Sequence, residues 1–242
     1  MTLDLIAGLV GVLAGVVAAV SGFGIGSLLT PTFALQAGTK AAVAAVSIPH
    51  LVGTLQRYWL LRSHVDRRML LAFGLTSAAG GLLGALAHVW LSSRGLTVIF
   101  GVLLILAAIA EATGWMAKVH WGRRSAWAAG ALSGIFGGLV GNQGSIRSAA
   151  MLGFDVPKEA FVATATAIGL FVDGARLPVY LATQWDDIAA QWPLVVSASI
   201  GVCIGTAIGS RLLRHIPRSM FRRIVAILLF ALGVYMLAAG GG

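Results

Sequence analysis

Charged side chains are scarce in this sequence. Only 17 basic and 8 acidic residues occur among 242, and 58% of the residues are hydrophobic, whereas about a quarter of the residues of a soluble domain are charged. This composition excludes an ordinary soluble domain. The formal net charge is +9, but the basic residues cluster in short segments between apolar runs. That distribution is typical of the cytoplasmic loops of membrane proteins, so we expect a lipid bilayer and no nucleic acid as partner.

Several chemistries are excluded by what is missing. The single cysteine, Cys203, rules out an internal disulfide. No nucleophile–base arrangement, phosphate-binding loop or metal-ligand spacing is present. The sequence therefore predicts no catalytic residues, no metal, no cofactor and no enzymatic activity.

Long apolar runs predict an all-α polytopic membrane protein, because about 20 mostly apolar residues suffice to cross a bilayer. A shift of 119 residues aligns Gly22 with Gly141 and, further on, Arg57 with Arg176. We therefore divide the chain into two repeats, 1–119 and 120–242. The eight predicted hydrophobic elements are 3–37, 40–62, 69–91 and 95–116 in the first repeat, and 125–155, 158–182, 188–212 and 219–239 in the second.

The charges of the loops predict how these elements cross. The segments around 62–68, 117–124 and 211–223 are basic and should be cytoplasmic, whereas 183–187 is acidic and should be outside. Two hydrophobic elements lie between 117–124 and 183–187, but an odd number of crossings is needed. We therefore predict that 125–155 is a glycine-broken, re-entrant hairpin, with 3–37 as its inverted counterpart. Eight full crossings with a poorer charge bias remain the alternative.

The predicted breaks carry polar residues that favour an anion. Glycines at SGFGIGS (21–27) and GNQGS (141–145) permit non-helical backbone, and the helix that follows each break directs N–H groups and its positive dipole end into the membrane. Candidate substrate-binding residues are Ser21, Gly22, Gly24, Ser27, Arg57, Asn142, Gln143, Gly144, Ser145, Arg147 and Arg176. Glycine packing between helices is the alternative explanation for these motifs.

A second pattern lies on the flanking helices. His50, Thr54 and Arg57 share one helical face, and Asp173 and Arg176 occupy matching positions of the second repeat. His50 and Asp173 are the candidate coupling residues, because intramembrane ionisable groups usually face a cavity and have partners. A purely structural Asp173–Arg176 pair is the alternative.

The segments SGFGIGSLLTP and GGLVGNQGSIRSAAML, together with eight hydrophobic elements in two halves, resemble the sulfite exporter TauE/SafE family. This resemblance implies a permease for sulfite or organosulfonates in the bacterial inner membrane. It does not assign Arg57, Arg147 or Arg176 to the substrate. The first break has Phe23 and Gly24 where the second has Asn142 and Gln143, so we expect an asymmetric site.

The sequence thus favours a secondary transporter that moves a small anionic, sulfur-containing substrate by alternating access. Coupling to protons or to the membrane potential would supply the energy, because no nucleotide-binding motif is present. The alternatives are a passive anion channel and a membrane scaffold without transport. A homodimer is compatible with the sequence.

Overall fold

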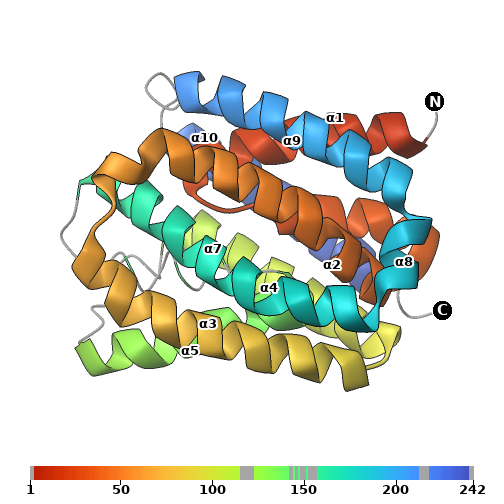
Figure 1. Cartoon of the computed structure of the whole chain (residues 1–242). Helices are drawn as coiled ribbons and strands as arrows, with labels where there is room; N and C mark the ends of the chain where they lie inside the picture. Colours follow the sequence, from red (N-terminus) through yellow and green to blue (C-terminus); the bar gives the residue numbers. More distant parts are fainter. Residues whose placement is uncertain are drawn as a thin grey trace.

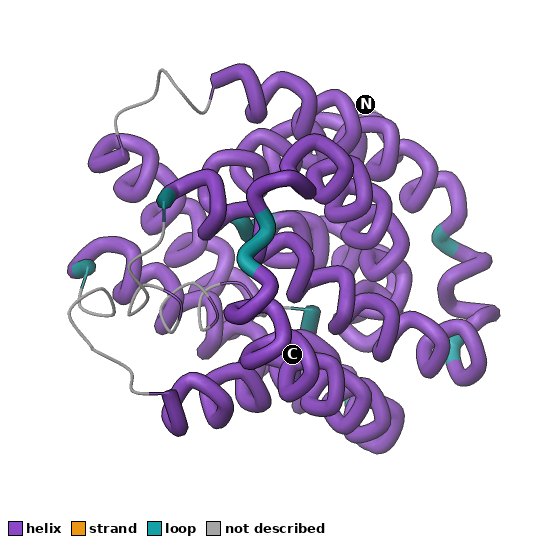
Figure 2. The backbone as a smooth tube through the Cα atoms, turned by 60° about the vertical axis from the view of Figure 1, so that its left-hand side comes forward, coloured by secondary structure: helices purple, strands orange, loops and turns teal. Residues whose placement is uncertain are grey.

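The chain was analysed as a computed structural model, which describes residues 3–114, 123–141, 144, 147, 151, 157–212 and 218–239. Every element of this described part is helical (Figures 1 and 2). The elements are α1 (Leu3–Ser21), α2 (Ile25–Leu61), the short 3₁₀ helix η1 (Arg62–His64), α3 (Arg67–Trp90), α4 (Ser93–Thr113), α5 (Arg123–Val140), α7 (Lys158–Thr183), α8 (Trp185–Ala190), α9 (Trp192–Leu212) and α10 (Arg218–Ala239).

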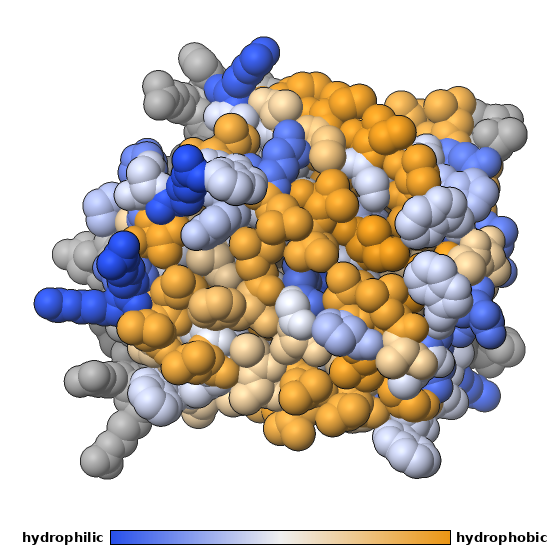
Figure 3. Space-filling view, in the orientation of Figure 1, coloured by the Kyte–Doolittle hydropathy of each residue, from blue (hydrophilic) through white to orange (hydrophobic). Residues whose placement is uncertain are grey.

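Several helices are long and apolar enough to cross a membrane. Among the described residues these are Leu3–Ser21, Arg67–Trp90, Ser93–Ala110, Glu159–Thr183 and Trp192–Arg211, with shorter apolar helices at Trp127–Val140 and Val225–Ala238. In Figure 3 apolar residues cover most of the middle of the face shown, and polar residues gather toward its two margins. The chain is therefore a multi-pass membrane protein whose described part is all-helical.

The α9 helix shows how its residues divide between lipid and protein. Val196, Ile200, Ile204 and Ile208 follow one another at every fourth position, and all four are exposed. A neighbouring face carries glycines at the same spacing, Gly201, Gly205 and Gly209, which lie directly against the backbone of α1. Small residues allow such close helix contact, and large apolar residues suit the lipid.

Two helix pairs pack closely and in parallel. Gly8 of α1 lies beside Ser197 and Gly201 of α9, and further along Gly15 lies beside Val202 and Thr206. In the same way Gly130 of α5 lies beside Phe73 of α3, whereas Gly138, two turns on, lies beside Gly81 and Ala85. In both pairs the residue numbers rise together. The starts of α3 and α5 therefore lie at one end of the bundle, and the starts of α1 and α9 lie together at the other.

The end of the bundle that carries the exposed residues Arg62, Arg67, Arg68 and Arg211 is called the basic end below. It lies on the left in Figure 1, and the N- and C-terminal labels lie on the right. The short connections between α3 and α4 and between α7 and α9 lie at the opposite end.

The α2 helix reverses direction at Gly38, which has φ 75° and ψ 168°. Ile25, in its first turn, lies beside Gly53, whereas a straight helix would hold these two residues about 42 Å apart. Gly38 itself lies against Ser93 at the opposite end of the bundle. The segment 25–37 therefore runs from the interior of the bundle to that end, and 39–61 runs back to the basic end.

The predicted helix 188–212 differs from the structure at its start. The expected helix 188–212 is divided at Gln191 into α8 and α9. Pro193 lacks the N–H group that would continue the helical hydrogen bonds from α8 into α9. The backbone N–H of Gln191 instead donates to the carbonyl of Ile188, at 3.1 Å.

Candidate functional site

The two glycine-rich interruptions lie against each other. The first separates α1 from α2, where Gly22 and Gly24 have positive φ angles of 84° and 128°, and the second follows α5, where Gly141 has φ 73°. L-residues with a side chain rarely adopt these angles. Gly26 lies so close to the Gly141 carbonyl that no side chain would fit there, and Gly144 lies in the same way against Phe23.

The place where the two interruptions meet is called the junction below, and Arg57 is the first of two buried arginines beside it. It belongs to the 39–61 part of α2, and only 3% of it is exposed. Its Nε donates to the Thr166 hydroxyl at 3.0 Å, and that hydroxyl donates to the Val162 carbonyl at 2.7 Å. Nη1 of Arg57 is buried with no hydrogen-bond partner in the described part of the chain.

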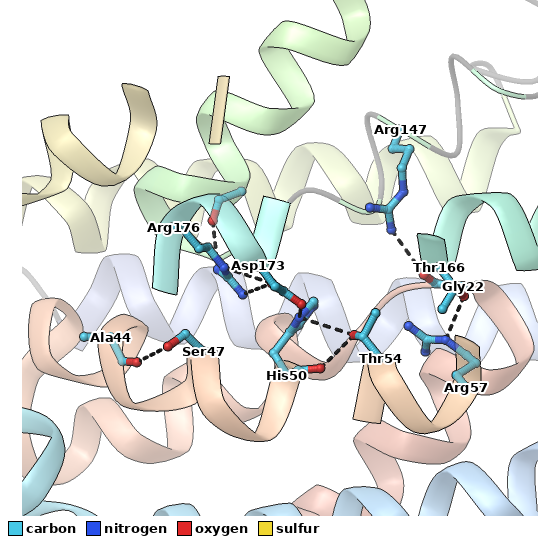
Figure 4. A network of polar contacts seen from close by, with 11 residues as sticks. Gly22, Ala44, Ser47, His50, Thr54, Arg57, Arg147, Thr166, Asp173 and Arg176 are labelled. Carbon is cyan, nitrogen blue, oxygen red and sulfur yellow. Dashed lines mark hydrogen bonds and ion pairs between the residues drawn. The ribbon is translucent and has the colours of Figure 1, made fainter. Parts of the chain in front are cut away.

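Arg147 is the second, and it is also 3% exposed. Its Nη2 donates to the Gly22 carbonyl at 3.4 Å, across the two interruptions. Its Nε and Nη1 are buried and, as far as the structure is described, have no partner. Arg147 and Arg57 are close enough to interact electrostatically, and Figure 4 shows both guanidinium groups directed toward the region around Gly22 and Thr166.

Arg176 differs from these two arginines because its donors are engaged. Its Nε and Nη2 contact Oδ1 of Asp173 at 3.0 and 2.8 Å, and its Nη1 donates to the Gly137 carbonyl at 2.8 Å. The pairing three residues apart that the sequence allows is therefore present. Asp173 also contacts His50. Nδ1 of His50 lies 2.8 Å from Oδ2 of Asp173. This contact joins α2 to α7 inside the bundle (Figure 4).

The last turn of α5 ends inside the protein, and its carbonyl groups have side-chain partners. Arg176 binds the Gly137 carbonyl, the Tyr180 hydroxyl donates to Gly138, and His88 Nδ1 lies 2.7 Å from the Leu139 carbonyl. The last carbonyls of a helix have no partner within the helix, so a buried end needs such groups. A cation there also interacts favourably with the helix dipole.

The sequence analysis did not identify Tyr180, His88 or Thr166 as part of this region. Thr166 could have been found, because it continues the face of Gly169, Asp173 and Arg176 by one further turn. His88 and Tyr180 gave no signal, since only the tertiary structure brings them to the end of α5.

The remaining candidate residues lie as follows. Ser21 ends α1, and its hydroxyl donates to the carbonyls of Val17 and Phe23 at 2.8 and 2.7 Å. Gly22 supplies the carbonyl that Arg147 contacts, Gly24 caps the start of α2, and Ser27 is buried in its first turn. Asn142, Gln143 and Ser145 lie outside the described residues. The structure thus brings Gly22, Arg57 and Arg147 to one place, with the His50–Asp173–Arg176 group beside it.

Nothing in the described ranges resembles a metal centre, since they contain no group of three His, Cys, Asp or Glu residues suited to one. The region is instead rich in hydrogen-bond donors and positive charge. Buried guanidinium groups with free N–H donors can bind oxyanions through charge-assisted hydrogen bonds.

Residues 7–236, nearly the whole chain, match the sequence profile of the family described as Sulfite exporter TauE/SafE. The chain belongs to the TauE/SafE family. The resemblance noted in the sequence is therefore confirmed, and TauE/SafE is a family of membrane transporters. No curated individual protein and no solved structure matches the chain.

Proposed function

We propose that this TauE/SafE protein is a secondary transporter that moves sulfite or a small organosulfonate across the bacterial inner membrane by alternating access. The observation that carries the proposal is the pair of buried guanidinium groups, Arg57 and Arg147, at the junction of the two interruptions. Each has N–H donors without a partner among the described residues. A buried charge without a counter-charge is costly, so such groups usually serve function rather than stability.

The helix packing supports an inverted repeat, which is typical of secondary transporters. With a shift of 119 residues, α1 corresponds to α5 and α3 corresponds to α9. The α1–α9 pair is then the counterpart of the α5–α3 pair, and both pairs are parallel. Because α5 starts at the basic end and α1 starts at the opposite end, the two halves have opposite orientations in the membrane.

The path of the chain also supports the two re-entrant hairpins. The chain passes inward along α1, breaks at 22–24 and returns along 25–37 to the end where it began. After α5 it breaks at Gly141, and α7 begins again at the basic end, near the start of α3, where the Asp66 N–H donates to the Thr164 hydroxyl. Irregular backbone at membrane depth is tolerated when it is buried in protein or lines a cavity.

The residues of the junction then have different roles. Arg57 and Arg147 bind the anion directly, and the N-terminal turn of α2, with Gly24 and Ser27, contributes its dipole. Ser21 and Gly22 shape the first break, and Gly141 marks the second. Asn142, Gln143, Gly144 and Ser145, which follow Gly141 in the sequence, stay candidate substrate-binding residues. Arg176 is a positioning residue, because its donors hold Asp173 and the end of α5.

His50 and Asp173 are the proposed coupling pair. They connect α2, which carries Arg57, with α7, whose Thr166 holds Arg57. A rearrangement that separates α2 from α7 would break this contact and leave two groups that can bind protons. Proton exchange at the pair would thus accompany the conformational change that moves the anion.

The direct test is transport by the purified protein in liposomes. Radiolabelled sulfite or sulfoacetate should be taken up with saturation, and unlabelled substrate inside the vesicles should accelerate uptake. A passive channel would show neither saturation at low concentration nor this counterflow. Arg147→Gln should abolish uptake, and the exposed-site variant Arg94→Gln should not. Equal uptake by Arg147→Gln and the unmodified protein would instead indicate a scaffold whose polar residues only pack.

A further inference from the structure

The positive charges at the junction outnumber the negative ones. Arg57, Arg147 and Arg176 are all at most 3% exposed, and Asp173 is the buried carboxylate beside them. Asp173 interacts electrostatically with all three arginines, but its hydrogen bonds go to Arg176 and His50. Among the described residues, three guanidinium groups against one carboxylate leave two positive charges without compensation.

The rest of the chain offers little further negative charge. Of the seven other acidic residues in the sequence, Asp4 and Glu159 lie in the first turns of α1 and α7, and Asp66 caps the start of α3. Asp186 and Asp187 belong to α8 at the opposite end of the bundle. Glu111 lies in the last turn of α4, and Asp155 precedes α7 and falls outside the described residues.

The polar partners of Arg57 and Arg147 are neutral. Within the described part of the chain they are the Thr166 hydroxyl and the Gly22 carbonyl, each of which binds one guanidinium nitrogen. Neither group lowers the net charge. The free donors, Nη1 of Arg57 and Nε and Nη1 of Arg147, remain for a ligand.

We infer that the site selects anions that carry two negative charges, and that it discriminates by charge against monoanions and zwitterions of the same size. This inference rests on the proposed function and specifies its substrate class. A dianion such as sulfite in its fully deprotonated form, or a sulfonate with a second acidic group, neutralises both guanidinium groups. A monoanion leaves one buried cation uncompensated, and a zwitterion brings an additional cation next to the arginines.

The test uses three two-carbon sulfonates that differ in the group at the far end. Sulfoacetate carries a carboxylate and a total charge of −2, isethionate a hydroxyl and a charge of −1, and taurine an ammonium group and no net charge. Binding to the purified protein is measured by isothermal titration calorimetry at pH 8 and constant ionic strength. Sulfoacetate should bind at least about tenfold more tightly than isethionate, since a charge-assisted hydrogen bond is lost with the second anion. Taurine should bind most weakly.

Variants of Arg57 test whether its charge or its shape determines the preference among the three ligands. Arg57→Lys retains the charge and should retain the order of the three ligands. Arg57→Gln removes one charge and should reduce the preference for sulfoacetate over isethionate to less than about threefold, because a monoanion then neutralises the site. Arg94→Gln, at an exposed position, should bind all three ligands like the unmodified protein. Thermal unfolding of each variant establishes that it is folded.

The outcomes are distinct. Equal binding of isethionate and sulfoacetate by a protein that transports sulfonates would overturn the charge selectivity and leave the proposed function intact. An unchanged preference in folded Arg57→Gln would also overturn it. If the unmodified protein neither binds nor transports any of these anions or sulfite, the proposed function and the inference fail together.

Discussion

His50 and Asp173 lie 2.8 Å apart across the contact between α2 and α7, although 123 residues separate them in the sequence. With Arg176 they form a buried group in which one carboxylate holds two basic side chains. This group connects the two halves of the chain at the depth where Arg57 and Arg147 lie. Removing a charge from this group should lower the melting temperature, whereas removing either of the two unpaired arginines should not.

Asp173→Asn should destabilise the protein strongly. It leaves the buried guanidinium of Arg176 without its carboxylate, a loss of about 3–5 kcal/mol in typical buried pairs. The melting temperature in detergent should fall, and the double variant Asp173→Asn with Arg176→Gln should recover part of the loss because the unpaired guanidinium of Arg176 is removed as well. A double variant that melts lower than both single variants would contradict this account.

Arg57→Gln and Arg147→Gln should behave in the opposite way. Each removes a buried cation that lacks a counter-charge, so the melting temperature should stay the same or rise while sulfite flux is lost. Arg176→Gln should lower the melting temperature instead, since it removes the partner of Asp173 and of the Gly137 carbonyl. Thermal unfolding and liposome uptake on the same preparations give both values. A marked loss of stability in Arg57→Gln would show that this arginine is structural.

The contact between the two interruptions should tolerate no added side chain. Gly26→Ala places a methyl group against the Gly141 carbonyl, and Gly144→Ala places one against Phe23. Both should reduce expression and transport, since overpacking typically costs about 1–3 kcal/mol. Gly174→Ala is the matched control, because a methyl group there meets nothing within 4 Å and alanine favours the helix. If Gly26→Ala transports as well as Gly174→Ala, the two interruptions do not touch in the functional protein.

The re-entrant topology can be tested by labelling single cysteines after Cys203→Ala. His120→Cys and Val156→Cys should react from the cytoplasmic side, and Asp186→Cys from the other side, because α5 and α7 both start at the basic end. Intact cells treated with an impermeant maleimide, with and without permeabilisation, give the answer. Labelling of positions 120 and 156 from opposite sides would restore eight full crossings.

His50→Gln should uncouple proton movement from anion movement if His50 and Asp173 form the coupling pair. The amide can still donate to Asp173, so the melting temperature should change little, but it does not bind a proton at neutral pH. A pH-sensitive dye trapped in the liposomes should report a substrate-dependent pH change with the unmodified protein and none with His50→Gln. The variant His88→Gln provides the comparison, because His88 lies at the end of α5 and not at this pair. Equal dye responses for His50→Gln and the unmodified protein would exclude the role.

Much of the architecture can be read from the sequence, because it depends on local properties. Scarce charge and long apolar runs require a membrane protein, and Gly22, Gly24 and Gly141 mark places where the helix is interrupted. The spacing of Asp173 and Arg176 also allows their pairing, which the sequence leaves as an alternative to a functional role, since residues three positions apart lie on one helical face. The division at Gln191 was not anticipated, although Pro193 was available as a signal.

What the tertiary structure decided is which arginine is free. The sequence offers Arg176 a possible partner in Asp173, but it leaves open whether the two pair and whether Arg57 or Arg147 has a counter-charge. Asp173 lies one turn from Arg176 on α7, but only the packing of α5 against α7 brings the Gly137 carbonyl to Arg176. Among the described residues, the tertiary structure leaves Arg57 and Arg147 with a hydroxyl and a backbone carbonyl. Apolar patterning and backbone freedom are properties of neighbouring residues, whereas the compensation of a buried charge depends on groups that distant segments bring within a few ångströms.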